Sequence, residues 1–220
     1  MPRQVHIDVY SDLICPWCLI GKQHLRQALA QAQAEEPDLQ VTVQWHAVQL
    51  VAGVPDEGWD YPAFYLRRLG SAAMVHTRQA QVREAAARAG VEIHFERITR
   101  IPNTAPGHQL LAYAAQHLAP AQLDALMERL FSAFFQRGEH IGQWPTLLSI
   151  ATEFSLDTRA LQDWIANNQG LPEQVEVPGV PFFVFNRAQA LSGAQPPATL
   201  LAAIRQTAIE TTPHAVACTL

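Results

Sequence analysis

Hydrophobic and polar residues alternate at the start of the chain and again further on. In segment 5–9, Val, Ile and Val alternate with His and Asp, which is the period-two pattern of a half-buried β-strand. In segment 16–34, apolar residues recur three and four positions apart, which predicts a helix that Pro37 ends. Alternation returns in segment 39–45. These residues therefore predict a strand–helix–strand unit, and its helical crossover favours parallel pairing of the two strands.

The middle of the chain changes to the helical period. After a loop-like segment at 54–62, residues 63–166 are typical of a mostly helical stretch. Its helical segments are centred on Arg67, Gln79, Leu111, Leu126 and Leu148. Segment 91–95 fits either a short strand or an extended connection. Asn103 followed by Thr104 predicts a helix entry, and Asp157 predicts the N-cap of the last helix in this stretch.

The final part returns to β character. Segment 180–185 is apolar, β-branched and aromatic, a short partner strand is expected at 189–191, and a last helix is expected from Pro197. We therefore predict an α/β protein with one mixed sheet. Residues 1–55 and 172–212 would form the sheet domain, residues 56–171 an all-helical insertion, and residues 213–220 a flexible tail.

Composition excludes several classes of protein. Of 220 residues, 49% are hydrophobic, which argues against disorder, and the net charge of -5 provides no basic excess for nucleic acid. No apolar run approaches the roughly 20 residues of a membrane helix. His6 and Asp8 interrupt the apolar residues near the start, so no signal peptide is expected and the sequence predicts a cytoplasmic protein.

The three cysteines divide into a pair, Cys15 and Cys18, and the isolated Cys218. Two cysteines three positions apart at a helix start share one face, and the positive end of the helix dipole favours a thiolate. Cys15 is the expected nucleophile, Cys18 the expected resolving thiol, and Pro16 and Trp17 shape the motif. A zinc site would need a second ligand pair with suitable spacing, which the sequence lacks; Cys218 and the nine scattered histidines are the residues that could complete one, and no metal is expected. Two inert buried cysteines are the other alternative.

A second feature is Val180–Pro181 at the start of the last apolar strand. Proline is unusual there because it cannot donate to the strand ladder. If the Val180–Pro181 bond is cis, the Val180 backbone would lie beside the cysteines and pair with an incoming peptide. Asp12 precedes the cysteines and would either shuttle protons to Cys18 or be a satisfied structural group. His108 is interpreted as a packing or capping residue.

In these features the chain resembles the DsbA-like branch of the thioredoxin superfamily, and specifically its FrnE-like members. The resemblance extends over nearly the whole length. It rests on Asp12 with Cys15-Pro16-Trp17-Cys18 and Ile20-Gly21, on Gly58, Asp60 and Tyr61, on Pro102-Asn103-Thr104 and His108, on Leu130-Phe131 and Phe134-Phe135, and on Gly179-Val180-Pro181-Phe182-Phe183-Val184 and Ser192-Gly193-Ala194-Gln195-Pro196. It implies a thioredoxin fold with a helical insertion, a cis Pro181 beside the cysteines, and thiol–disulfide exchange. The chain departs from the family pattern at 47–50, where a Pro-Phe-containing segment is usual.

The resemblance also implies partners and alternatives. The expected substrates are protein or small-molecule disulfides and dithiols, with no tightly bound cofactor and glutathione as a co-substrate at most. Ser192, Gly193 and Asn103 would then contribute to substrate binding. Related 2-hydroxychromene-2-carboxylate isomerases and kappa-type glutathione transferases share the architecture but typically carry serine at the first cysteine position. A glutathione-dependent isomerase or transferase, and a chaperone-like binding module, therefore stay open, as does a monomer or a homodimer.

Overall fold

One four-stranded mixed sheet organises the computed structural model, which describes residues 3–167 and 176–210. Its strands lie in the order β2-β1-β5-β6. They are β1 (Arg3–Ser11), β2 (Leu39–Ala47), β5 (Phe182–Phe185) and β6 (Gln189–Ser192). β1 pairs with β2 in parallel, as the strand–helix–strand pattern predicts, and with β5 in antiparallel orientation. Distant parts of the chain therefore meet at β1, where Val9 is opposite Trp45 on one side and Phe183 on the other.

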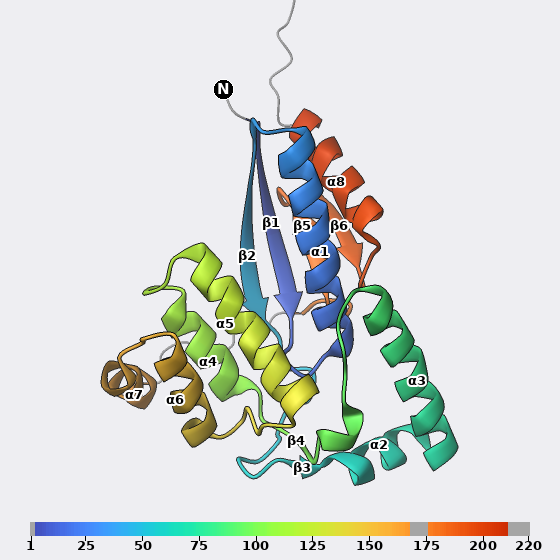
Figure 1. The fold of residues 1–220 in the computed structure, drawn as a ribbon, viewed down its shortest axis with the longest axis vertical. Coiled ribbons are helices and arrows are strands. Elements are labelled where there is room, and N and C mark those ends of the chain that lie inside the picture. Colours follow the sequence, from blue (N-terminus) through green and yellow to red (C-terminus); the bar gives the residue numbers. More distant parts are fainter. Residues whose placement is uncertain (1–2, 168–175, 211–220) are drawn as a thin grey trace, which may run out of the picture.

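Two helices cover one face of this sheet. They are α1 (Pro16–Glu35) and α8 (Pro197–Glu210), which pack against each other in front of the strands in Figure 1. The inward residues of β1 meet apolar residues of both helices in one core, made of Val5, Ile7, Val9, Leu25, Ala28, Ala32, Leu39, Phe183, Phe185, Leu200, Leu201, Ala203, Ile204 and Ala208. Burial of each large apolar side chain stabilises the fold by about 1.5–3 kcal/mol. The polar residues of β1 face the other way, so the alternation in the sequence reports the two faces of the sheet.

The elements between β2 and β5 form the insertion. They are β3 (Trp59–Asp60), α2 (Tyr61–Leu69), α3 (Ala72–Arg88), a 3₁₀ turn (Phe95–Arg97), β4 (Arg100–Ile101), α4 (Ala105–Ala114), α5 (Pro120–Ser132), a π-helical turn (Ala133–Arg137), α6 (Trp144–Glu153) and α7 (Thr158–Ala166). The insertion is helical as expected, except that β3 and β4 form a small antiparallel ladder. Strands of two residues are too short to produce an alternating pattern in the sequence, so the expectation of an all-helical segment missed them.

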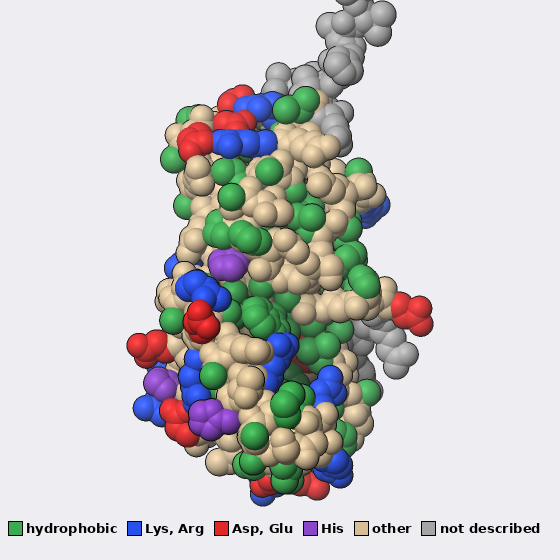
Figure 2. Space-filling model, turned by 90° about the vertical axis from the view of Figure 1, so that its right-hand side faces the viewer, with side chains coloured by type: hydrophobic (Ala, Val, Ile, Leu, Met, Phe, Trp, Pro, Cys, Tyr) green, Lys and Arg blue, Asp and Glu red, His purple; other side chains and the backbone are tan. Residues whose placement is uncertain are grey.

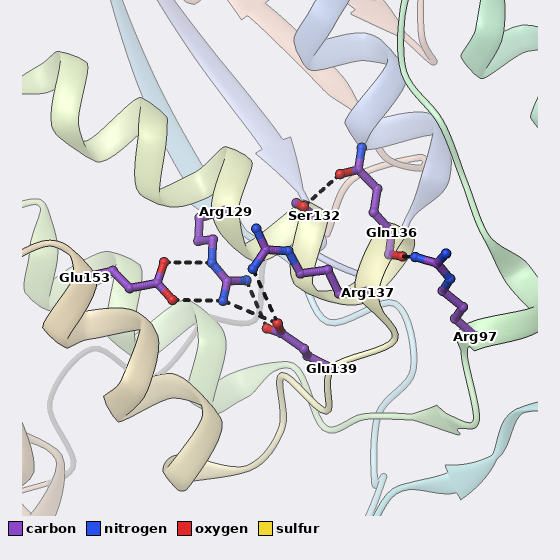
Figure 3. A network of polar contacts seen from close by, with 7 residues as sticks. All are labelled: Arg97, Arg129, Ser132, Gln136, Arg137, Glu139 and Glu153. Carbon is purple, nitrogen blue, oxygen red and sulfur yellow. Dashed lines mark hydrogen bonds and ion pairs between the residues drawn. The ribbon is translucent and has the colours of Figure 1, made fainter.

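Within the insertion, a charged network holds α5 against the segments that follow it (Figure 3). Arg129 of α5 donates to both carboxylate oxygens of Glu153 on α6, at 2.8 and 2.9 Å, and to Glu139 at 2.9 Å. Gln136, in the π-helical turn, accepts from Arg97 through its backbone carbonyl. The network ties together elements whose apolar sides are buried in a second core, which includes Phe131.

A second set of charges joins the insertion to the sheet domain. Lys22 of α1 is 2% exposed and forms ion pairs with Asp124 and Glu128 of α5, at 2.6 and 2.7 Å. Gln23 also donates to Glu128, at 2.6 Å. Because a buried cation needs partners, these contacts fix α5 beside the helix that begins at the cysteines.

Several smaller predictions can be compared directly with the structure. Asp157 caps α7 and accepts from the backbone N–H of Arg159 and Ala160, as predicted. In segment 91–95 the structure has no strand: residues 91–94 form an irregular connection, and Phe95 begins the 3₁₀ turn. The domain boundary expected at 171–172, the tail at 213–220 and Cys218 all fall outside the described residues. Across residues 3–167 and 176–210, no helix is long and apolar enough to cross a membrane.

Candidate active site

The two cysteines of the pair lie at the start of α1, with both thiols free. Cys15 is the N-cap residue, and Pro16 occupies the first turn, where the missing N–H of proline costs nothing. The backbone N–H of Cys18 donates to the carbonyl of Cys15 at 3.0 Å, which closes the first helical turn. Cys15 is 5% exposed, whereas Cys18 is fully buried. Both cysteines are therefore buried, but Cys15 keeps a small exposed area whereas Cys18 keeps none.

The cysteines meet the loop that precedes β5. The Val180–Pro181 peptide bond is cis, and the Cys15 thiol donates to the carbonyl oxygen of Val180 at 3.7 Å. The carbonyl of Pro181 in turn accepts from the backbone N–H of Gly193 at 2.8 Å. Gly21 of α1 allows this close approach, because a Cβ atom at that position would lie 2.9 Å from Cγ of Pro181. Cys15 and Val180, which are 165 positions apart in the chain, are thus in contact through the Cys15 sulfur.

Beneath the motif lies a buried carboxylate. Asp12 is fully buried; its Oδ2 accepts from the backbone N–H of Leu50 at 2.8 Å, and its Oδ1 lies 3.2 Å from Nε2 of His108. The backbone carbonyl of Asp12 also accepts from the N–H of Cys15 at 3.1 Å. A single residue therefore connects the cysteine motif, the loop after β2 and helix α4.

The environment of Cys18 favours its neutral form. Burial raises the pKa of the Cys18 thiol well above its ordinary value, and the hydrogen bond with Cys15 and the negative charge on Cys15 raise it further. A backbone contact with Asp12 lowers the pKa, but by less. Cys18 is therefore held as a neutral thiol.

A pocket of about 630 Å³ opens beside Cys15. It is lined by residues from the start of α1, the loop after β2, helices α2 and α3, Phe95, and Val180. The lining is mainly aromatic and aliphatic, and its charged side chains are Arg68 and Arg78. Figure 2, which views the molecule from the side of α3 and α8, shows hydrophobic side chains and Lys and Arg side chains around a hollow in the lower half.

The structure brings some of the predicted site residues together and leaves others apart. Cys15, Pro16, Trp17 and Val180 all line the pocket. Cys18, Asp12 and Pro181 lie behind that surface, in contact with it. The remaining three do not line the pocket: Asn103 accepts from Gln49 and from the backbone N–H of Ala105, and Ser192 and Gly193 lie at the end of β6. Their part in substrate binding stays a prediction.

Other residues of the site carry no signal in the sequence, or one that does not reveal their partner. His108, for which the sequence predicts a packing or capping role, is buried and contacts Asp12 across 96 positions of the chain. Arg68, Arg78 and Tyr65 reach the site from α2 and α3. No motif marks them, because exposed arginines on a helix look the same in a sequence whether or not they face a pocket. Across the described ranges, no group of three or more His, Cys, Asp or Glu side chains could hold a metal ion.

Comparison with known proteins assigns this fold to a family. A family model described as the DSBA-like thioredoxin domain matches residues 6–205, and the chain belongs to this family of thiol oxidoreductases. The chain is also 28% identical to the protein YwbO of Bacillus subtilis over an alignment of 192 residues, which covers 82% of this chain and 86% of YwbO.

Solved structures share the same fold. A probable DsbA oxidoreductase from Streptomyces coelicolor matches with a TM-score of 0.79 and 24% identity, covering 95% of this chain and 92% of the other. The cytosolic disulfide reductase DsbM from Pseudomonas aeruginosa, solved with GSH, matches with a TM-score of 0.59 and 17% identity over 91% and 98% of the two chains. A 2-hydroxychromene-2-carboxylate isomerase matches with a TM-score of 0.60 and 16% identity over 93% of this chain and 97% of the other. These likenesses show that the chain shares the fold of all three proteins.

Proposed function

We propose that this protein is a thiol–disulfide oxidoreductase in which Cys15 is the nucleophile and Cys18 the resolving thiol. The observation that carries this proposal is the asymmetry of the pair. Cys15 occupies the N-cap position of α1 and lines a pocket, while Cys18 lies fully buried one turn later with its pKa raised by burial. One thiol that borders a pocket beside one fully buried thiol is the arrangement that exchange through a mixed disulfide requires.

The reaction proceeds in two balanced steps. The Cys15 thiolate attacks one sulfur of a substrate disulfide; the substrate S–S bond breaks, the first substrate thiol leaves, and Cys15 holds the second half as a mixed disulfide. Cys18 then gives up its proton and attacks the Cys15 sulfur, which forms the Cys15–Cys18 disulfide and releases the second substrate thiol. One substrate disulfide is reduced and two enzyme thiols are oxidised. The reverse sequence oxidises a dithiol.

Three groups around the motif have supporting roles in this proposal. The free N–H groups at the start of α1 stabilise the negative charge on Cys15. The Val180–Pro181 loop, which contacts the Cys15 sulfur through the Val180 carbonyl, positions the substrate next to that sulfur. Asp12, buried below the motif, accepts the proton that Cys18 must lose before the second step.

Mass spectrometry of alkylated protein tests the proposal. The protein is treated with a disulfide, alkylated, reduced and alkylated again with a second reagent, and Cys15 and Cys18 are expected to carry the second label together. Cys18→Ser should accumulate a mixed disulfide on Cys15, and Cys15→Ser should accumulate none. Cys218→Ser serves as the matched control and should behave as the unchanged protein. Failure of Cys15 and Cys18 to form a reversible disulfide would refute the proposal.

The same variants separate this function from a glutathione-dependent isomerase or transferase, whose fold the chain shares. Transfer to glutathione or isomerisation with glutathione needs no resolving thiol. Turnover that survives Cys18→Ser and saturates with glutathione would therefore favour that second function. Loss of multiple turnovers in Cys18→Ser favours disulfide exchange, with glutathione only as a reductant of the oxidised pair.

A further inference from the structure

We infer that Arg68 and Arg78 form an anion-binding subsite that selects small disulfides with an apolar, aromatic body and a carboxylate. This inference rests on the proposed function, because it requires Cys15 as the reacting thiol. It adds the chemical class of the substrate, which the cysteine motif does not specify. The two arginines lie on different helices, α2 and α3, and both line the pocket next to Cys15.

The charge of the pocket is the first observation. Among its lining residues, all of which lie in the described part of the chain, there is no Asp, Glu, Lys or His beside the two arginines. Neighbouring arginines of α3 have acidic partners: Arg83 pairs with Glu96 at 3.0 Å and Arg88 with Glu84 at 2.5 Å. Within residues 3–167 and 176–210, Arg68 and Arg78 form no ion pair with a carboxylate. Two positive charges next to a nucleophilic sulfur favour an anionic ligand.

The position of Arg78 is the second observation. Its guanidinium lies over the ring of Trp17, 5.6 Å from the ring centre, and Trp17 is inside the cysteine motif itself. A cation held over an aromatic face keeps its position and its unused donors. The stacking therefore places those donors near the first cysteine, where a bound carboxylate would orient an attached disulfide.

Tyr65 links the two arginines to the cysteine. Burial raises the pKa of the Tyr65 hydroxyl, the positive charges of Arg68 and Arg78 lower it, and the negative charge of Cys15 raises it. All three charges thus act on the same hydroxyl, which also belongs to the pocket wall. Because Cys15, Arg68 and Arg78 line the same pocket of about 630 Å³, a single small molecule bound there can contact both the sulfur and the arginines.

The rest of the pocket suits an aromatic body. Tyr61, Phe64 and Phe95 contribute aromatic side chains, and Leu50 and Met74 are exposed apolar residues that also line it. A volume of about 630 Å³ lies within the range of about 300–1,000 Å³ typical of small-molecule sites. Such a pocket encloses one or two aromatic rings, and the arginines supply the few polar contacts that fix orientation.

In the inferred reaction, the reduced protein is the reductant. Cys15 attacks one sulfur of an aryl disulfide and releases the first aryl thiol, and Cys18 then displaces the second aryl thiol from Cys15. One disulfide becomes two thiols, while the cysteine pair becomes a disulfide. No further reductant is needed within a single turnover.

Two aromatic disulfides, one anionic and one uncharged, test the inference. Dithiobis(nitrobenzoate) carries a carboxylate on each ring, whereas dithiodipyridine is uncharged, and both release a coloured thiol. The second-order rate constants for reduced protein with each probe are measured by stopped flow, and their ratio removes any general change in Cys15 reactivity. Arg68→Gln and Arg78→Gln are each expected to lower the ratio of the carboxylate probe to the neutral probe about tenfold. Arg67→Gln and Arg88→Gln, which remove equal charge outside this pocket, are the matched controls.

The outcomes separate the inference from the function on which it rests. A lowered ratio in the two pocket variants with an unchanged ratio in the controls supports the subsite. Equal ratios in all four variants would overturn it, while oxidation of Cys15 and Cys18 by the neutral probe leaves the proposed function intact. If the pocket variants slow reduction of a protein disulfide but neither small probe, the arginines serve a protein partner and the small-molecule subsite is wrong. If neither probe joins Cys15 to Cys18, the proposed function itself fails.

Discussion

The Nε2 atom of His108 lies 3.2 Å from Oδ1 of Asp12, and both side chains are buried. His108 belongs to α4 in the insertion, and Asp12 belongs to the loop that leads from β1 into the cysteine motif. The insertion therefore contributes a side chain to the buried polar contacts beneath the cysteine motif. A buried carboxylate with a histidine partner is a group that can exchange protons, and this gives the contact a testable consequence.

Asp12→Asn should slow the resolving step. Asparagine keeps the size of the side chain and an acceptor for the N–H of Leu50, but it cannot take a proton from Cys18. With dithiodipyridine and reduced protein, release of the first thiol should keep its rate, whereas release of the second should slow about tenfold or more. Stopped-flow absorbance resolves the two phases. The pH dependence of the second phase should also change, which a purely structural role for Asp12 would not produce.

Asp8→Asn is the matched control for this experiment. Asp8 on β1 is also a carboxylate with histidine partners, since it accepts from His46 of β2 at 2.7 Å. It lies four positions before Asp12 and outside the site. Its substitution should leave both phases unchanged at neutral pH. A second phase that is unaffected by Asp12→Asn would contradict the proton-acceptor role.

Gly21→Ala should disturb the loop before β5. A Cβ atom at position 21 would lie 2.9 Å from Cγ of Pro181 and 3.3 Å from Cζ of Phe183, so the loop must shift. Overpacking of this kind costs about 1–3 kcal/mol, more than the helix propensity gained by alanine. We expect a lower midpoint in urea unfolding and slower formation of the mixed disulfide. Gly179→Ala, where a Cβ atom meets nothing within 4 Å, is the control, and its urea midpoint and its rate of mixed-disulfide formation should both stay unchanged. Equal behaviour of the two variants would show that the contact is unimportant.

The ion pairs of Lys22 should respond unequally to removal of the acid or the base. Asp124→Asn with Glu128→Gln leaves the 2% exposed ammonium of Lys22 without a counter-charge, and unfolding free energy should fall by roughly 3 kcal/mol. Lys22→Met leaves two carboxylates that are 48% and 30% exposed and can be hydrated, so it should cost clearly less. Urea unfolding followed by tryptophan fluorescence measures both. A larger loss in Lys22→Met would be evidence against this account.

Asp8 should make stability depend on pH in the acid range. Burial would raise the pKa of Asp8, but hydrogen bonds from His46 and His6 lower it below its ordinary value of 3.8. A lowered folded-state pKa contributes stability that is present above the unfolded-state value and is lost as pH falls through the folded-state value. Asp8→Asn should therefore cost about 1 kcal/mol at neutral pH, and this difference should shrink below pH 3.8. If the stability difference between the unchanged protein and Asp8→Asn grew on acidification, the pKa of Asp8 would not be lowered by folding.

Much of the fold could be predicted because its signals are local. The period-two pattern of segment 5–9 and the helical period after Pro16 report which face of each element is buried. The pairing of β1 with β2 follows from the helical crossover between them. The ladder of β3 and β4 could not be predicted, because two residues carry no period.

The features of the candidate site also fall into those that the sequence predicts and those that only the structure reveals. The sequence by itself determined the cysteine pair at a helix start and the proline before a late strand, because each is a short motif whose chemistry depends on adjacent residues. Only the tertiary structure decided that Cys15 contacts Val180, that Asp12 contacts His108, and that Arg68 and Arg78 face one pocket. These contacts join residues that are far apart in the chain. They depend on which helix faces pack together, and side-chain packing in three dimensions has no period along the sequence.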